Sequence, residues 1–272
     1  MEDNIKNNDM DNQVLGLVKA VPNVIGQVYQ DIAQPSVQAV GKALGTVFEF
    51  STSFLLPVKL LNEKFKLNFT KRLDEYKKKL EEIPEEKRCE VHPQIGTPII
   101  EKLTYTTTDE IADLFTTLLA NASNKDTVNK AHPSFVSMIE RLSPDEAKIL
   151  NFIKEEDYIP YTEIRAEKDG DYEILESHLT TLKYDLDLMF PQNIGAYLSN
   201  FISLGIIVGN RDAWIQLTAE EEYARMCNNF RLDELKSELV PNKYSDIIAR
   251  RDFFIVTPIG KLFIDACISK SK

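Results

Sequence analysis

Residues 131–150 read AHPSFVSMIERLSPDEAKIL, and this stretch contains two helix starts in succession. In its first half, apolar residues recur at helical spacing after a histidine–proline pair. Its second half begins with an N-cap residue, a proline at the first helical position and a capping-box glutamate, which are Ser143, Pro144 and Glu146. The stretch therefore predicts two helices that meet at a boundary near residue 143.

Upstream of this stretch, the sequence predicts one long amphipathic helix. Apolar residues recur every three or four positions between residues 58 and 83, and most of the intervening residues are lysine or glutamate. The apolar stripe consists of Val58, Leu61, Phe65, Phe69, Leu73, Tyr76, Leu80 and Ile83. Pro84 and the charged run after it end the helix.

The region before the long helix is poor in charge. Only four side chains between Gln13 and Val58 are charged, and apolar residues again recur at helical spacing. Prolines divide the region, and a proline interrupts a helix because it lacks an amide hydrogen. We therefore expect several helices over residues 13–83, preceded by a polar, disordered tail over residues 1–12.

Residues 84–143 form a central helical block. The segment 91–105 is rich in proline and glycine and predicts an extended connector with one short helix. Thr107 and Glu110 have the spacing of a capping box at a helix start. The apolar face of that helix is expected at Ile111, Leu114, Phe115, Leu118 and Leu119.

From residue 144 onward, the pattern mixes helices with strands. We expect strands at 159–164, 206–208 and 252–256, and a helix over 171–187. Another helix begins at Pro191 and ends at Gly205, a typical C-cap residue, and Thr257 caps a final helix. A helix that ends in Leu-Gly-Ile-Ile before a strand pair is typical of winged-helix domains.

The sequence thus predicts a mainly α protein with three parts. An N-terminal helical region (13–83) contains the long amphipathic helix, and the central helical block (84–143) follows. The last part (144–272) is a winged-helix-like α+β module with an acidic, helical insertion over 212–251.

The charge distribution argues against nucleic-acid binding. The chain has 32 basic and 43 acidic residues, a formal net charge of −11, and residues 144–272 hold 15 basic against 23 acidic side chains. The expected recognition helix at 192–203 has no lysine or arginine, although DNA readers need cations for phosphates and donors for base edges. We interpret the module as a scaffold or protein-binding unit, with DNA binding as the alternative.

No motif predicts a catalytic, metal or cofactor site. The three cysteines are far apart, which favours a reducing cytoplasm. His132 and Ser134 are neighbours in HPSF, a spacing that rarely aligns a nucleophile with its base. The acidic run at 167–173 lacks the full EF-hand pattern, so we interpret it as a solvated loop. We therefore expect no catalytic residue, no metal ligand and no cofactor.

The charge-poor N-terminal region suggests a membrane or self-association face. Its candidate residues are Val40, Leu44, Val47, Phe48, Phe54 and Leu55. Interfacial helices usually carry a basic polar face, which is missing here, so packing in a core or an oligomer is favoured over contact with lipid. The polar, acidic start is unlike a secretory signal, and no run of 18 apolar residues occurs. We expect a cytoplasmic protein, with peripheral membrane contact as the alternative.

Residues 36–155 resemble the abortive infection alpha family, also known as the DUF4393 domain. The resemblance rests on the charge-poor segment, the long Lys/Glu helix, the connector PQIGTPIIEKLTYTTTDEIADLFTTLLANASN (93–124) and the closing stretch quoted above, where HPSF and LSPDEAKIL are most specific. We interpret these signature residues as structural: His132, Pro133, Phe135, Ser143, Pro144 and Glu146. The resemblance carries over no catalytic motif, and it implies a bacterial or prophage-encoded role in phage defence.

Two functional hypotheses follow. In the first, a non-enzymatic defence protein binds a phage or host protein, or perturbs the membrane with its N-terminal helices, either alone or as a homo-oligomer. In the second, a nucleic-acid-linked regulator uses the winged-helix-like module, which the acidic surface disfavours.

Overall fold

The computed structural model describes residues 26–32, 36, 38–43, 56–156, 158–210, 219–240 and 243–269, with side chains of the long helix described from residue 67 onward. The chain divides into two compact units. The first comprises residues 1–142 with 265–272, and the second comprises residues 143–264. The predicted disordered tail over 1–12 lies outside the described residues.

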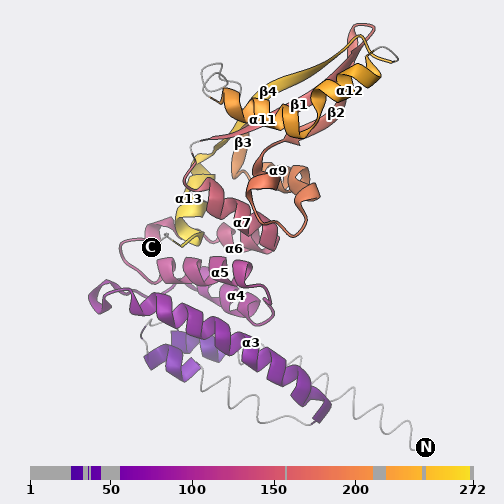
Figure 1. The fold of residues 1–272 in the computed structure, drawn as a ribbon. Coiled ribbons are helices and arrows are strands. Elements are labelled where there is room, and N and C mark those ends of the chain that lie inside the picture. The colour runs from indigo at the N-terminus through magenta and orange to yellow at the C-terminus, as the bar shows by residue number, and fades with distance from the viewer. Residues whose placement is uncertain are drawn as a thin grey trace, which may run out of the picture. The chain divides into compact units, whose positions relative to one another are not determined.

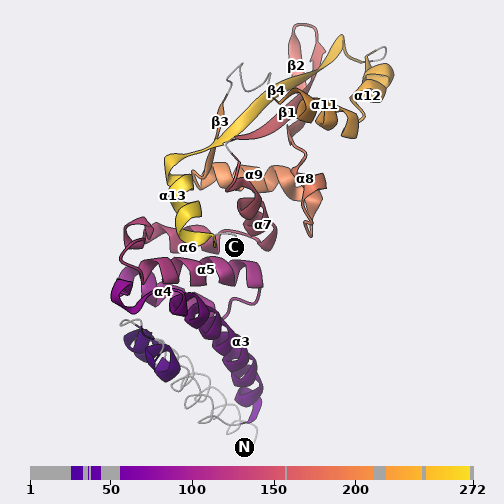
Figure 2. The same ribbon diagram turned by 60° about the vertical axis from the view of Figure 1, so that its left-hand side comes forward.

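The described part of the first unit is helical. Helices α3 and α5 lie side by side (Figures 1 and 2), and α4 and α6 pack against α5. The bounds are α3 Leu56–Glu81, η1 Glu85–Lys87, α4 Pro93–Leu103, α5 Asp109–Ala122, η2 Val128–Lys130 and α6 Ser134–Glu140.

Apolar stripes hold these helices together as predicted. The stripe of α3 is buried from Phe69 onward, and so is Ile83 just beyond the helix. All five residues of the predicted apolar face of α5 are also buried. The helix expected within the connector over 91–105 is α4, but it covers residues 93–103, so the expected extended conformation is wrong for most of the segment.

The predicted capping box of Thr107 and Glu110 is wrong. Helix α5 begins at Asp109, its N-cap is Thr108, and the Thr108 side chain makes no capping hydrogen bond. The carbonyl of Thr107 instead accepts a hydrogen bond from Arg72 Nη2 at 3.1 Å. The Thr107 carbonyl thus connects the start of α5 to α3, while the helix itself begins one residue later than the spacing suggested.

Part of the charge-poor N-terminal region packs into the first unit. Residues 26–32 and 38–43 are helical, and their apolar side chains Val28, Ile32 and Val40 are buried. The Tyr29 hydroxyl donates to the carbonyl of Val91 at 2.9 Å. Val40 is thus a core residue, and the other residues of the proposed face lie outside the described part of the chain: Leu44, Val47, Phe48, Phe54 and Leu55.

The second unit contains a four-stranded antiparallel sheet in the order β2-β1-β4-β3. Its elements are α7 Pro144–Ile153, β1 Tyr158–Lys168, β2 Asp171–Leu179, α8 Leu182–Asp185, η3 Pro191–Asn193, α9 Ile194–Ser203, β3 Ile207–Asn210, α11 Glu220–Asn229, α12 Leu232–Leu239, β4 Asp246–Val256 and α13 Pro258–Cys267. The last residues of α13 belong to the first unit. The mainly helical fold class is confirmed, whereas the winged-helix-like topology stays a prediction.

Several local predictions in this unit are confirmed. Helix α9 ends before Gly205, whose φ of 71° suits glycine. Thr257 caps α13, because its Oγ1 accepts from the Gly260 amide at 2.9 Å. Helices α11 and α12 occupy the middle of the predicted insertion.

Two predictions are wrong here. Residues 171–179 form strand β2 rather than a helix, since they pair with β1. The insertion is helical only in part, because residues 246–251 belong to β4 and extend its pairing with β1.

One face of the sheet packs against α11 and α12 (Figure 1). Buried Ile164, Ala166 and Ile247 from the strands contact Tyr223 and Met226 from α11 in one apolar cluster. The Tyr223 hydroxyl also donates to the carbonyl of Asp252 at 2.8 Å. The helices therefore bury the apolar side of the long strands and leave the edge strand β2 largely exposed.

Candidate functional site

The predicted helix start at residue 143 is confirmed. Ser143 Oγ accepts from the Glu146 amide at 3.3 Å, and Glu146 Oε2 accepts from the Ser143 amide at 2.6 Å. Pro144 occupies the first turn, where a missing amide hydrogen costs nothing. The second carboxylate oxygen of Glu146 accepts from Asn200 Nδ2 of α9 at 2.7 Å. The capping glutamate therefore also attaches α7 to α9.

The carboxylate of Asp145, in the same turn, accepts three hydrogen bonds. Asp145 is 2% exposed, and its carboxylate accepts from the amides of Met189 and Phe190 at 2.8 and 2.9 Å. The Tyr197 hydroxyl donates to the same group at 2.9 Å. A buried carboxylate is stable only when several donors bind it. Two of the donors here are backbone amides, so these bonds also fix the 189–190 backbone against α7.

The ionisation of Asp145 reflects this environment. Burial raises the pKa of the carboxyl, but the amides of Met189 and Phe190 and the Tyr197 hydroxyl together lower it below its ordinary value. Burial and the neighbouring Asp145 charge raise the pKa of Tyr197. At neutral pH the pair is therefore a carboxylate with a neutral phenol donor.

Lys148 adds a further contact from the same helix. Its ammonium group donates to the carbonyl of Asp187 at 2.8 Å. We call Asp145, Glu146 and Lys148 the α7 clamp, because all three bind the segment between α8 and the end of α9. The signature stretch LSPDEAKIL thus supplies long-range contacts besides a helix cap.

The segment held by the α7 clamp exposes apolar side chains. Met189 is 69% exposed and Phe190 is 47% exposed, although their backbone amides are fixed by Asp145. No charged residue occurs between Leu188 and Asn210. We call the side chains of Met189 and Phe190 the Met189–Phe190 surface. Two adjacent exposed apolar side chains on a backbone held by hydrogen bonds make this segment a candidate protein-binding site.

The HPSF residues have a local role. His132 Nδ1 accepts from the Ser134 amide at 3.2 Å and lies 2.7 Å from Ser134 Oγ. Pro133 occupies the N-cap position of α6, and Phe135 is fully buried. The His132 ring also lies 5.6 Å from the Phe135 ring. This geometry favours the start of a helix rather than an activated serine.

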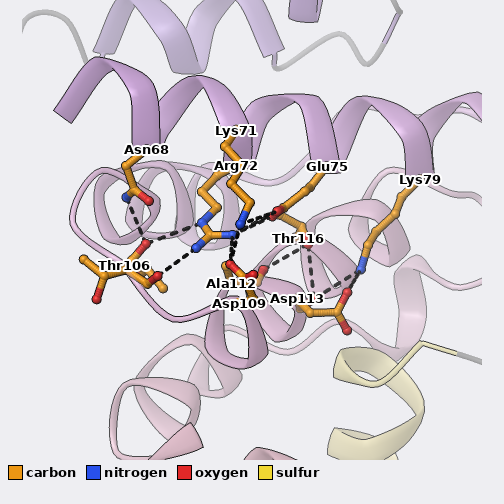
Figure 3. Close-up of polar contacts among 11 residues, drawn as sticks. Asn68, Lys71, Arg72, Glu75, Lys79, Thr106, Asp109, Ala112, Asp113 and Thr116 are labelled. Carbon is orange, nitrogen blue, oxygen red and sulfur yellow. Dashed lines mark hydrogen bonds and ion pairs between the residues drawn. The ribbon is translucent and has the colours of Figure 1, made fainter. Parts of the chain in front are cut away.

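A second polar cluster connects α3 and α5 (Figure 3). The Arg72 guanidinium is 1% exposed and contacts Glu75 at 2.9 Å and Asp109 at 2.8 Å. It also donates to the carbonyls of Thr106 and Thr107. Hydrogen bonds from Lys71 and Arg72 lower the pKa of Asp109. A guanidinium has five N–H donors in one plane, so a single arginine can bind two carboxylates and two carbonyls at once.

The cluster continues along α3 to Lys79. Its ammonium group lies 2.6 Å from Asp113 Oδ1 and 3.2 Å from Ser269 Oγ, and it also contacts Thr117. The long helix is therefore bound to α5 at two places, through Arg72 and Asp109 and through Lys79 and Asp113. The cluster thus fixes the packing of the long helix against α5.

The second unit also has a hollow of about 240 Å³ whose lining includes Glu156, Asp185, Glu222 and Arg225. Arg225 pairs with Asp185. Burial, and then the charge of Glu156, raise the pKa of Glu222. Among the described residues, no group of histidine, cysteine or acidic side chains has the arrangement of a metal site.

Comparison with known proteins assigns this mainly helical chain to a family. The family model for abortive infection alpha matches residues 63–267, so the chain belongs to the abortive infection alpha family. No curated protein matches. The structure of an uncharacterized protein from the marine bacterium Alcanivorax borkumensis SK2 has a TM-score of 0.36 and 12% identity, covering 53% of this chain and 96% of that one.

The sequence displays the cap at Ser143 and Glu146, but it does not reveal which distant residues contact the helix that begins there. Asp145 lies within the predicted capping box, yet its partners are more than forty positions away in the chain. The uncharged run after Leu188 is visible in the sequence, but it does not distinguish an exposed apolar surface from a buried core segment. No sequence pattern indicated that Arg72 would be buried, because it lies among the many charged residues of α3.

Proposed function

We propose that this protein serves in phage defence by binding a phage or host protein, without enzymatic chemistry, through the Met189–Phe190 surface. The observation that carries the proposal is the α7 clamp, which uses buried charged groups to fix a backbone whose side chains face solvent. Preorganising an apolar anchor lowers the entropy lost on binding. Membership of the abortive infection alpha family supports the defence role.

Several features favour a protein partner over lipid. The apolar residues described in the N-terminal region, such as Val28, Ile32 and Val40, are already buried. None of the helices in the described part of the chain combines the length and apolar character needed to cross a bilayer. The excess of acidic side chains after residue 143 also repels anionic headgroups.

The proposal is compatible with a winged-helix-like second unit. Helix α9 precedes β3, and strands β1, β4 and β3 are neighbours, which supports a relation to winged-helix domains. The helix in the recognition position carries no cation, and apolar Met189 and Phe190 precede it. We therefore propose that this module has a protein-binding use rather than a DNA-binding one.

Photocrosslinking in infected cells tests the proposal. A benzoylphenylalanine at position 190 should crosslink one protein during phage infection, whereas the same group at the exposed position Val128 should not. A Met189→Ser change should abolish the crosslink without lowering the amount of folded protein. Equal crosslinking from both positions would contradict the proposal.

A vesicle assay tests the lipid alternative. Purified protein should cause no dye leakage from phosphatidylglycerol vesicles, with or without residues 13–58. Leakage that requires residues 13–58, together with loss of protection in their absence, would favour membrane perturbation instead.

A further inference from the structure

Strand β2 presents an open backbone edge. It is the outermost strand of the sheet (Figure 2) and pairs with β1 on one side only. In the described part of the chain, no element other than β1 forms backbone hydrogen bonds with it. Residues 171–174 are exposed. Such an edge can accept another extended segment through main-chain hydrogen bonds.

The side chains of β2 differ between its two faces. Tyr172 and Ile174 are 51% and 48% exposed, and they lie opposite Glu167 and Arg165 of β1. Asp171 and Glu173 lie opposite Lys168 and Ala166, on the face that α11 and α12 cover. A strand added beside β2 would therefore meet apolar and acidic side chains alternately.

Charge selects among the strands that could be added. Between residues 163 and 176, the hairpin carries six acidic and two basic side chains. Pairing with β2 of a second copy would bring two acidic strands together without any basic residue of β2 to offset them, and like charges on neighbouring strands destabilise a sheet. A strand rich in lysine or arginine would instead gain favourable cross-strand pairs.

We propose that β2 binds an extended segment of a partner protein as a fifth strand of the sheet. The segment alternates apolar residues, which pack beside Tyr172 and Ile174, with lysines or arginines, which face the acidic residues Asp171 and Glu176. Glu173 already accepts a hydrogen bond from the Tyr244 hydroxyl at 2.6 Å. This surface differs from the Met189–Phe190 surface. Its failure in a binding assay would therefore leave the proposed defence role untouched.

A peptide titration with the full-length protein tests the proposal. The probe is the acetylated nonapeptide KVKVKVKVK, measured by calorimetry and by hydrogen exchange. We expect binding with slower exchange confined to residues 171–178. The control peptide carries N-methyl groups on three consecutive central residues and should bind at least tenfold more weakly, because it cannot form the ladder. The peptide EVEVEVEVE should not bind.

Protein variants separate strand addition from general charge attraction. Glu176 is a further exposed acidic residue of β2 and lies opposite Ile164 of β1. Asp171→Lys with Glu176→Lys should weaken binding at least tenfold. The matched control, Glu81→Lys with Glu221→Lys, changes the net charge equally at exposed positions and should bind as the unchanged protein does. Equal weakening by both variants, equal binding of the N-methylated peptide, or protection outside β2 would overturn the proposal. So would a dimer of the free protein that the β2 variant abolishes.

Discussion

The α7 clamp predicts a specific effect of Asp145→Asn. The substitution keeps the size of the side chain but replaces one acceptor oxygen with a donor and removes the charge. The buried carboxylate accepts three hydrogen bonds, of which the asparagine oxygen can keep only part. An asparagine oxygen in the place of Oδ2 keeps the bonds from Phe190 and Tyr197 without their charge and loses the bond from Met189, whose amide then faces an NH₂ group. A hydrogen bond to a charged group contributes about 1.5 kcal/mol or more, and a buried donor left unsatisfied costs about 1–3 kcal/mol, so the free energy of unfolding should fall by about 3 kcal/mol.

Two measurements check this value. Urea unfolding gives the change in free energy, and hydrogen exchange reports the amides of Met189 and Phe190 directly. We expect both amides to exchange faster in the variant. The control is Asp187→Asn, which removes a nearby exposed carboxylate but keeps the carbonyl that Lys148 binds. A loss below about 0.5 kcal/mol, the scale of ordinary surface substitutions, with unchanged exchange at 189 and 190 would refute the clamp.

Three further predictions concern the packing and ionisation of other residues. Gly260→Ala should lower the free energy of unfolding by about 1–3 kcal/mol in thermal or urea unfolding, because the added Cβ would lie 2.1 Å from the carbonyl oxygen of Ile206; an unchanged midpoint would contradict this contact. Arg72→Met should lower the free energy of unfolding by about 2–3 kcal/mol in urea unfolding, since it removes the donor to the Thr107 carbonyl and one of the two side-chain donors to Asp109. The stability of Arg72→Lys should lie between those of the unchanged protein and Arg72→Met. Burial lowers the pKa of His178, so the unfolded state takes up a proton first and stability should fall as the pH drops below about 6.5. Asparagine tolerates the φ of 55° at this position, so His178→Asn should fold and should reduce the change of the unfolding midpoint with pH between pH 5 and 7. An equal pH dependence of the midpoint in both proteins would refute the attribution of this effect to His178.

Local signals predicted much of the helical framework. The stripe from Phe69 to Leu80 and the box at Ser143 and Glu146 each depend on neighbouring residues, so the sequence displays them directly. The end of α9 at Gly205 belongs to the same class, because a left-handed backbone favours glycine.

The errors occurred where distant residues decide the structure. Residues 171–179 place Ile174, Leu175 and Leu179 at helix-like spacing, yet pairing with β1 makes them a strand. The irregular register near Ile164 further hides the alternation that a strand usually displays. Helix α5 begins at Asp109 with Thr108 as its N-cap, one residue after the position that the capping-box spacing of Thr107 and Glu110 suggested.

Of the candidate site, only the start of α7 was predictable from the sequence. The cap that begins α7 is a local pattern, whereas Asp145 meets Met189, Phe190 and Tyr197 through the fold alone. Exposure of Met189 could not be inferred either, because an apolar residue in an uncharged run is ordinarily assigned to the core.

A phage challenge of expressing cells tests the central claim most directly. The variant Met189→Ser with Phe190→Ser changes two exposed side chains and leaves their amides bound to Asp145, so the protein should fold normally. The control, Leu67→Ser with Val128→Ser, changes two other exposed apolar residues. We expect the unchanged protein and the control to reduce phage plating on a sensitive host, and the first variant to lose that protection at equal protein levels. Full protection by the Met189/Phe190 variant would contradict a defence role for this surface.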